Sequence, residues 1–298
     1  MSTMILGRDG QVGHALVDAL APLGPLQTLS RADYDLADPD QRESLAQRIA
    51  QDRPALIVNA AAYTAVDRAE SEPGLAHQIN AEAVSVIAQA AQRVGARLIH
   101  YSTDYVFDGS GTRPWRESDP TAPQSVYGHS KRAGEEAFLA SGCRGAIFRT
   151  SWVHSIQGNN FVKTMLRLAQ ERDRLSVVAD QIGAPTSARL IANVTLHAVR
   201  ALRAGVMSGG LYHLSAAGET SWHGLAVYAI ERARAAGAPI KVAAGQIQAI
   251  TTEDYPTAAK RPKNSRLDCR RLCDALGVDL PDWQVDVDQT VNGILVAR

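Results

Sequence analysis

Tyr127 and Lys131 are the two residues of this chain whose types and spacing best suit acid–base chemistry. If the chain is helical from Ser125 onward, the two side chains lie one turn apart on the same face. A free tyrosine has a pKa of about 10, which holds the proton too tightly for efficient exchange near neutral pH. A nearby ammonium favours the phenolate, so we expect Lys131 to lower the pKa of Tyr127.

Ser102, Thr103 and Asp104 lie upstream and supply a hydroxyl that such a pair needs. The hydroxyl of Thr103 is suited to hold a carbonyl oxygen within reach of the Tyr127 phenol. Thr103, Tyr127 and Lys131 together predict a proton donor to a ketone whose carbon receives a hydride. Taken alone, the tyrosine and lysine fit a surface pair on a helix equally well. The prediction therefore depends on the elements around them.

A glycine-rich turn follows the first apolar segment of the chain. Residues 3–6 are expected to form a buried strand, and residues 14–21 a helix. Between them lie Gly7, Gly10 and Gly13, with the spacing G-x-x-G-x-x-G. A strand, a glycine turn and a helix amino terminus in this order can cradle a pyrophosphate with backbone N–H groups. Glycines alone are also compatible with a simple tight turn.

The end of the second expected strand, residues 26–29, bears on the choice of dinucleotide. An acidic residue there would bind the ribose 2′-hydroxyl, but Ser30 and Arg31 occupy the position. An arginine suits a 2′-phosphate, so the sequence favours NADPH, with NADH possible. Asp35 and Leu36 are expected beside the adenine.

Residues 55–58 form a continuous apolar run, which is typical of a parallel strand covered on both faces. Ala60, Ala61 and Ala62 follow after Asn59, and such small side chains let a cofactor lie close to the backbone. The alternative is that the alanines begin a helix.

Strands and helices alternate through the first half of the chain. Further strands are expected at 97–101 and 146–148, and a late one at 211–214. This predicts an α/β fold with a doubly wound, Rossmann-like parallel sheet and a smaller carboxyl-terminal α/β substrate lobe. We expect the cofactor domain at residues 1–150 plus about 187–215, and the lobe at about 151–186 and 216–298. The second half is less regular, with helices expected at 159–170, 190–202 and 226–236 and a strand at 177–178.

Composition excludes several classes of protein. The 298 residues include 31 Lys+Arg and 31 Asp+Glu, so the chain has no net positive charge that would attract nucleic acid or an anionic membrane. No apolar run approaches the ~20 residues of a membrane span, and we expect no signal peptide. Three cysteines fit a reducing cytoplasm better than a disulfide framework.

Lys260, Arg261 and Lys263 form a basic segment, which fits either a phosphate-bearing ligand or a solvated loop.

The motifs together resemble the extended short-chain dehydrogenases, and more narrowly the dTDP-4-dehydrorhamnose reductases. The likeness covers nearly the whole chain, and its later motifs are more specific than the glycine turn. The segments that carry it are Gly7–Gly13, Asn59–Glu70, Ser102–Phe107, Tyr127–Lys131, Arg149–Trp152, Gly158–Phe161, Asp180–Thr186 and Arg261–Ser265.

This resemblance implies reduction of the C4 ketone of dTDP-4-dehydro-L-rhamnose to dTDP-L-rhamnose by NADPH or NADH. It makes Tyr127 the proton donor, and it makes Lys131 the residue that binds the nicotinamide ribose and lowers the tyrosine pKa. Substrate contacts are implied for Thr103, Asp104, Trp152, Asn160, Arg261 and Asn264. Cofactor contacts are implied for Gly10, Gln11, Val12, Asp35, Leu36, Ala62, Tyr63, Thr64 and Tyr101.

One departure from the family pattern concerns a metal. Some of these reductases dimerise around a magnesium ion held by carboxylates, but Ala15 and Arg189 stand at two of the expected positions. Magnesium needs hard oxygen ligands, so we expect no metal and a monomer rather than a magnesium-bridged dimer.

Two alternative functions stay open. One is a reductase or epimerase for another nucleotide sugar, and the other is a non-catalytic regulatory subunit of the same fold, as in methionine adenosyltransferase.

Overall fold

A six-stranded parallel sheet forms the centre of the molecule. The computed structural model describes residues 2–297. The strands are β1 (Thr3–Leu6), β2 (Leu26–Leu29), β3 (Leu56–Asn59), β4 (Arg97–Thr103), β5 (Gly145–Thr150) and β10 (Gly210–His213), in the order β10-β5-β4-β3-β1-β2. All neighbouring strands are parallel. The chain reverses its direction of winding between β1 and β3, which opens a crevice at the carboxyl ends of these strands.

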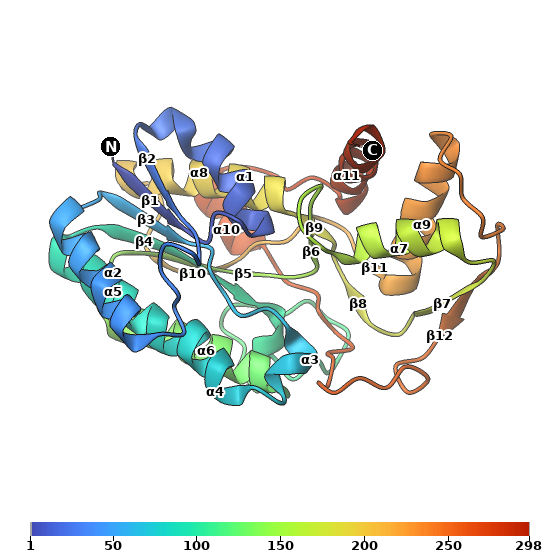
Figure 1. The fold of residues 1–298 in the computed structure, drawn as a ribbon, viewed down its shortest axis with the longest axis horizontal. Coiled ribbons are helices and arrows are strands. Elements are labelled where there is room, and N and C mark those ends of the chain that lie inside the picture. The colour runs from blue at the N-terminus through green and yellow to red at the C-terminus, as the bar shows by residue number, and fades with distance from the viewer. Residues whose placement is uncertain (1, 298) are drawn as a thin grey trace.

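Helices cover both faces of the sheet (Figure 1). One layer contains α1 (Gln11–Leu20), α8 (Ala188–Ala204) and α10 (Arg270–Leu276). The other contains α2 (Pro39–Asp52), α5 (Ala83–Val94) and α6 (Val126–Ala140). Two short helices, α3 (Val66–Ala69) and α4 (Pro73–His77), precede α5, and a π-helical segment at Gln78–Glu82 joins α4 to α5. The predicted doubly wound α/β fold is confirmed.

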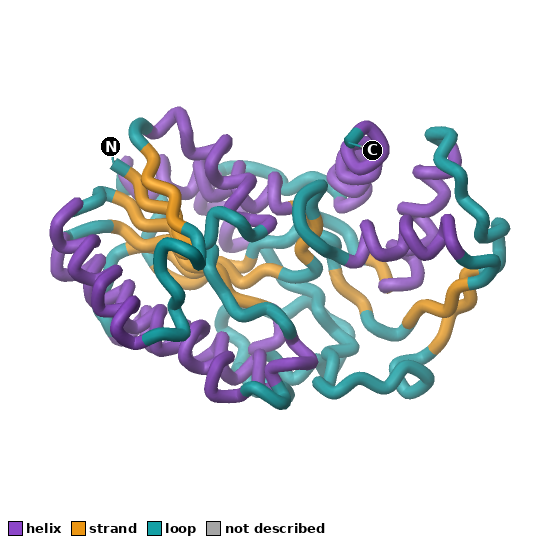
Figure 2. Tube along the Cα trace, in the orientation of Figure 1, coloured by secondary structure: helices purple, strands orange, loops and turns teal. Residues whose placement is uncertain are grey.

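A smaller α/β region lies beside the sheet domain (Figure 2). Its helices are α7 (Phe161–Glu171), α9 (Trp222–Ala235) and α11 (Trp283–Val296). Its strands are β6 (Val153–His154), β7 (Leu175–Val178), β8 (Ile182–Gly183), β9 (Thr186–Ser187), β11 (Thr220–Ser221) and β12 (Ile247–Ile250). They pair as β12-β7, β6-β9 and β11-β8. The chain enters this region after β5, returns to the sheet through α8 and β10, and then enters it again.

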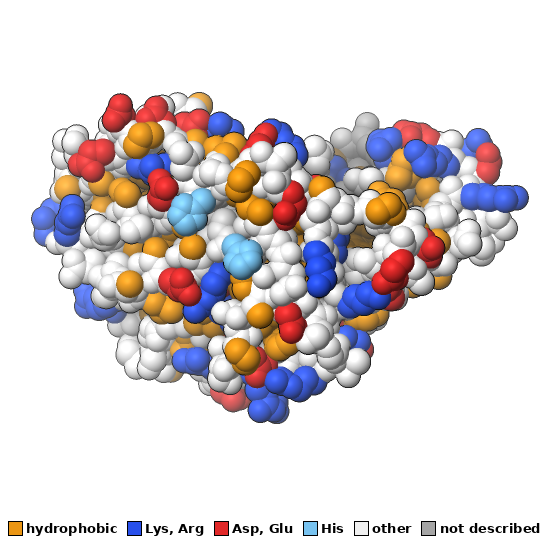
Figure 3. All heavy atoms as spheres, turned by 90° about the horizontal axis from the view of Figure 1, so that it is seen from below, with side chains coloured by type: hydrophobic (Ala, Val, Ile, Leu, Met, Phe, Trp, Pro, Cys, Tyr) orange, Lys and Arg blue, Asp and Glu red, His pale blue; other side chains and the backbone are white. Residues whose placement is uncertain are grey.

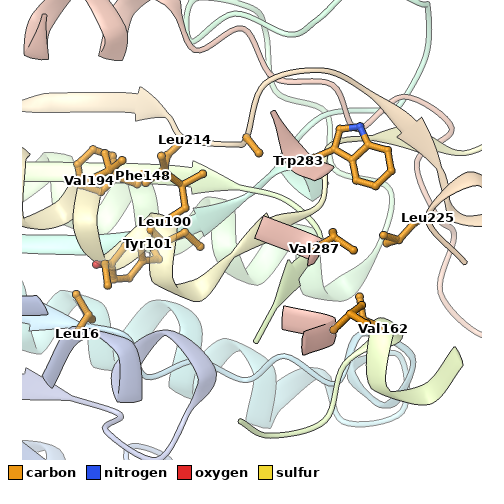
Figure 4. Packing of buried hydrophobic residues seen from close by; sticks show 14 of the residues in the cluster. Leu16, Tyr101, Phe148, Val162, Leu190, Val194, Leu214, Leu225, Trp283 and Val287 are labelled. Atoms are coloured by element: carbon orange, nitrogen blue, oxygen red, sulfur yellow. The ribbon is translucent and has the colours of Figure 1, made fainter. Parts of the chain in front are cut away.

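Apolar packing joins the two regions. Every residue of β1 and β3 is buried, because helices cover both faces of these strands. One core cluster runs from Tyr101 and Phe148 on the sheet, past α8, to Val287 and Trp283 of α11 (Figure 4). The sheet and the smaller region therefore share one hydrophobic core.

Several element boundaries differ from those expected. Helix α1 begins at Gln11 rather than residue 14, because Gly10 already has the extended conformation of an N-cap. Strand β4 continues to Thr103, so Ser102 and Thr103 lie within the strand and Asp104 follows it. Strand β12 and helix α11 were not predicted. β12 is a short strand in which only Ile247 is buried, which gives little hydrophobic signal.

On the face seen in Figure 3, basic and acidic side chains are interspersed. This distribution agrees with the equal numbers of the two charges in the sequence. Among residues 2–297, no helix is long and apolar enough to cross a lipid bilayer.

A buried ion pair joins α6 to β5. Arg149 donates from Nε and Nη2 to the two carboxylate oxygens of Glu135, each at 2.7 Å. Both side chains are almost fully buried. Burial opposes the charge on Glu135, but hydrogen bonds and the charge of Arg149 hold its pKa below the usual value. The pair therefore fixes the helix that carries Tyr127 and Lys131 to the sheet.

Replacing Arg149 by leucine should lower the free energy of unfolding by up to about 3–5 kcal/mol, since the buried Glu135 charge would keep Arg132 as its only ion-pair partner. Urea denaturation measures this loss. Arg167→Leu is the control, because that arginine forms an exposed pair with Glu171 on α7. Equal stability of the Arg149 and Arg167 variants would contradict the structural role of the buried pair.

Candidate active site

Helix α6 places Tyr127 and Lys131 together, as the sequence predicted. The Ser125 side chain caps the helix by accepting a hydrogen bond from the Gly128 N–H at 3.1 Å. Gly128 lies so close to the strand-end backbone that a Cβ there would stand 2.3 Å from the carbonyl oxygen of Tyr105. Tyr127 and Lys131 are consequently both buried beside the carboxyl end of β4.

The Lys131 ammonium is held by backbone. Its Nζ donates to the carbonyl oxygen of Tyr101 at 2.6 Å. Burial lowers the pKa of Lys131 to about 8, against the opposing charge of Glu135. Lys131 therefore gains and loses a proton close to neutral pH.

The expected direction of the Tyr127 pKa is wrong. Burial raises the pKa of Tyr127 well above its ordinary value, and a hydrogen bond with Thr103 offsets this only in part. Desolvation penalises the phenolate more than any neighbouring group stabilises it. The phenol therefore keeps its proton at neutral pH, which is the form that a proton donor needs. An alkoxide is a much stronger base than a phenolate, so the proton can still be transferred to one.

Thr103 and Asp104 lie beside the phenol. The Thr103 hydroxyl donates to Asp104 Oδ1 at 3.1 Å and accepts from the Tyr105 N–H at 3.2 Å. Burial raises the pKa of Asp104 to about 6. The structure thus brings Thr103, Asp104 and Tyr127 together at the carboxyl edge of the sheet.

A pocket of about 330 Å³ opens at the crevice between β1 and β3. Most of the predicted cofactor residues line it: Gly7, Gly10, Ser30, Arg31, Leu36, Ala60, Ala61, Ala62, Tyr63 and Thr64. A Cβ on Gly7 would stand 2.6 Å from the Ala61 backbone nitrogen, and Gly7 has a positive φ of 82°. Only glycine fits there. The turn after β1 and the Ala60–Ala61 segment after β3 can therefore approach closely, and together they shape the floor of the pocket.

Other predicted cofactor residues lie outside this pocket. Gln11 accepts hydrogen bonds from Ser155 and Asn160, which tie the glycine turn to the smaller region. Val12 packs against the large core cluster. The Tyr101 side chain is also in the core, with its hydroxyl 2.7 Å from Thr195 Oγ1, so only its carbonyl faces the site.

The residues after β2 form a small network of their own. Ser30 donates from its backbone and its hydroxyl to Asp33. Arg31, which is largely exposed, donates to Asp35 from Nη2 at 2.9 Å and from Nε at 3.2 Å. Asp35 thus contacts Arg31 rather than lining the pocket, and it competes with any phosphate for that guanidinium.

Of the expected substrate residues, Trp152 lies in an aromatic stack, whereas Asn160 and Asn264 use their side chains for hydrogen bonds within the protein. Trp152 stacks on Trp222 with ring centroids 3.7 Å apart, and it holds a left-handed backbone with φ 50°. Asn160 caps α7 and donates to Gln11 and to the Ser155 carbonyl. Asn264 is buried, and both its amide hydrogens bond to carbonyls of the 110–113 loop. The two asparagine side chains therefore hold loops together.

The basic segment is mostly paired with acidic residues. Arg261 donates to Asp67 at 2.5 Å and to the Tyr105 hydroxyl at 3.0 Å. Lys263 contacts Glu253 and Asp180. Residues 108–111, 252–253, 255–261 and 263 together line a second pocket of about 700 Å³. The segment borders a cavity large enough for a ligand, and its charges are partly neutralised within the protein.

Among the described residues, no group of three or more His, Cys, Asp or Glu side chains is placed to hold a metal ion. Arg189 donates to Asp286 at 2.9 Å, and both residues line a pocket that also contains Ala15.

Sequence reasoning missed several residues of the site. Asp9, Tyr34 and Ile79 also line the cofactor pocket. Asn59 and His100 lie behind it as neighbours on β3 and β4. A polar residue at the end of a buried strand is the signal that could have indicated Asn59, whereas His100 lies in the middle of β4.

Comparison with known proteins agrees with this geometry. A sequence family described as "RmlD substrate binding domain" matches residues 1–296. The dTDP-4-dehydrorhamnose reductase of Shigella flexneri is 50% identical over 296 residues, covering 98% of this chain and 97% of the relative. That of Burkholderia thailandensis is 46% identical over 299 residues, covering 99% of both chains.

Solved structures agree as well. A dTDP-4-dehydrorhamnose reductase from Clostridium acetobutylicum superposes with a TM-score of 0.89 at 33% identity and covers 100% of both chains. One from Bacillus anthracis, solved in complex with NADP, gives a TM-score of 0.87 at 36% identity, over 97% of this chain and 98% of that one. With this match over nearly its whole length, the chain belongs to the RmlD substrate-binding domain family.

Proposed function

We propose that this protein reduces the C4 ketone of dTDP-4-dehydro-L-rhamnose to dTDP-L-rhamnose, using NADPH or NADH. The observation that carries the proposal is the grouping of Tyr127, Lys131 and Thr103 at the carboxyl edge of β4, beside a pocket at the β1–β3 crevice. Relatives up to 50% identical that carry this reductase name support the choice of substrate.

The residues of the site divide the reaction between them. The nicotinamide supplies the hydride when it is bound. Thr103 and Tyr127 hold the ketone oxygen, and Tyr127 donates its proton to that oxygen as it gains charge. Lys131 binds the ribose and stabilises the phenolate that remains. The small residues Ala60–Ala62 and the amino terminus of α1 receive the dinucleotide.

We assign cofactor binding to residues 1–150 with about 187–215, and nucleotide-sugar binding to about 151–186 and 216–298. Trp152 and Arg261 are the proposed contacts of the smaller region with the nucleotide sugar. The position of Arg261 at the pocket of about 700 Å³ supports this role. A bound diphosphate would compete with Asp67 for the Arg261 guanidinium.

A substrate panel tests the proposal. The enzyme is given NADPH with the 4-keto-6-deoxy sugar linked to dTDP, UDP or GDP, and cofactor absorbance is followed. We expect rapid oxidation with the dTDP sugar and much slower oxidation with the others. Preference for UDP or GDP would indicate a reductase for another nucleotide sugar, and no oxidation with any sugar would favour a regulatory protein.

Tyr127→Phe should lose most turnover, because general acid catalysis contributes about 10²–10⁴-fold, while the fold and cofactor binding persist. Steady-state kinetics and fluorescence titration of NADPH measure the two effects. Tyr212→Phe is a matched control, since that buried phenol bonds to Ser208 on the far edge of the sheet. Near-normal turnover of the Tyr127 variant would remove this residue from its assigned role.

Arg31→Ala should reduce the ratio of kcat/KM for NADPH over NADH by about tenfold, the usual effect of losing one charge-assisted hydrogen bond. Asp35→Asn should raise the ratio, because it weakens the hold on Arg31. Arg93→Ala, at an exposed site on α5, serves as the control. An unchanged ratio in both Arg31 and Asp35 variants would reject a 2′-phosphate contact.

We also propose a metal-independent monomer. The alanine at position 15 offers no ligand, and the Arg189 guanidinium, beside Asp286, would repel a cation. Gel filtration with and without chelator, with activity assayed in parallel, should give one monomeric peak and equal rates. A dimer that dissociates in chelator, or activity restored only by magnesium, would show that this proposal is wrong.

A further inference from the structure

A buried histidine lies behind Lys131 and has no part in the mechanism above. His100 is 1% exposed on β4, and its Nε2 lies 3.5 Å from Lys131 Nζ. On the other side of the ring, Nδ1 lies 3.3 Å from the side-chain nitrogen of Asn59. The imidazole therefore stands between the catalytic lysine and the strand that leads into the cofactor pocket.

Asn59 determines where the ring carries its proton. The Asn59 Oδ1 atom accepts a hydrogen bond from the Ala61 N–H at 3.1 Å, so its NH₂ group faces the imidazole. An NH₂ group can only donate, which makes Nδ1 the acceptor and leaves the proton on Nε2. A proton on Nδ1 could donate to the Asn59 backbone carbonyl. It would, however, also set two donors against each other across the 3.3 Å between Nδ1 and the Asn59 side-chain nitrogen.

The ring is uncharged in this setting. Burial, and then the charge of Lys131, lower the pKa of His100 well below its ordinary value. A neutral ring with its proton on Nε2 presents an N–H to Lys131. That N–H can donate to a neutral amine, but it repels an ammonium.

The other groups around Lys131 act in the opposite direction. The Tyr101 carbonyl accepts from Nζ and favours the ammonium. The Glu135 carboxylate, one turn further along α6, also favours it, but both its oxygens bond to Arg149. The Tyr127 phenol is uncharged at neutral pH. Of these neighbours, His100 is therefore the one whose orientation favours the amine.

We propose that His100 is a positioning residue for Lys131: oriented by Asn59, it directs an Nε2–H at the lysine and favours the neutral amine. The catalytic consequence of this inference, the return of a proton to Tyr127, rests on the proposed reductase function. A lysine poised between its two forms near neutral pH exchanges protons readily, as a group that restores the proton of Tyr127 must do. His100 touches neither cofactor nor substrate in this role.

NMR titration of Lys131 tests the inference without any assay of activity. The chain contains five lysines, at 131, 163, 241, 260 and 263, so [¹³C]lysine labelling gives a simple spectrum in which Lys131→Met assigns the signal. His100→Gln can turn an amide oxygen toward Lys131 and should raise its titration midpoint by about one pH unit. An unchanged midpoint in the folded variant would overturn the proposal.

His154→Gln is the matched control, because His154 is also buried but contacts Thr290 of α11 in the smaller region. It should leave the Lys131 midpoint unchanged. In parallel, the fall of kcat/KM at high pH should shift in His100→Gln by the same amount as the titration midpoint of Lys131. A lower kcat without this shift would show that His100 only supports the fold.

The wild-type protein provides a second test that needs no variant of His100. Long-range ¹H–¹⁵N spectra of the imidazoles distinguish the two neutral forms of the ring. We expect His100 to carry its proton on Nε2 from pH 6 to 8. A proton on Nδ1 would reverse the effect on Lys131 and overturn the proposal, whether or not the protein reduces the sugar.

Discussion

The close packing of α6 against its neighbours is the constraint on which the site depends. Gly128 approaches the Tyr105 carbonyl, and a Cβ on Gly134 would stand 2.1 Å from the carbonyl oxygen of Asn80. A larger residue at either position would force the helix away from the Tyr105 or Asn80 backbone. Asn80 also bonds to the Tyr63 backbone in both directions and to the Ser130 hydroxyl. The same contact therefore positions the catalytic helix and one wall of the cofactor pocket.

Burial then decides how the catalytic side chains ionise. It raises the pKa of Tyr127 and lowers the pKa of Lys131 to about 8. Desolvation disfavours the charged form of each group, so a phenol and an amine move in opposite directions. The result is a tyrosine that retains its proton beside a lysine that exchanges one easily. This combination suits a reduction, in which the enzyme must give a proton to oxygen and then recover it.

The sequence predicted the sheet because its strands are short apolar runs followed by glycines, alanines or polar residues. All six strands match within one or two residues, and five of them lie in the first 150 residues, where local patterns are clear. Helical spacing also placed Tyr127 and Lys131 on one face, and the elements around them indicated that this face lies at a site. Strand β12 and helix α11 lack such patterns, since their positions depend on packing in the smaller region.

The site was predicted less completely, for two physical reasons. Spacing shows that Lys131 is near Tyr127, but the direction of the tyrosine pKa depends on burial, which a single sequence does not give. Contacts between distant segments are also invisible: Arg261 with Asp67, and Asn264 with the 110–113 loop, are separated by about 150 residues or more. The basic segment therefore suggested free charges, whereas the structure pairs most of them.

The destination of the hydride tests the account most directly. The dTDP-linked 4-keto sugar is incubated with NADPH that carries deuterium at the transferred position, and the product is examined by NMR and mass spectrometry. The account predicts one deuterium at C4 of dTDP-L-rhamnose, with the hydroxyl proton drawn from solvent through Tyr127. A product without deuterium at C4, or a sugar that is epimerised while the cofactor stays reduced, would contradict it.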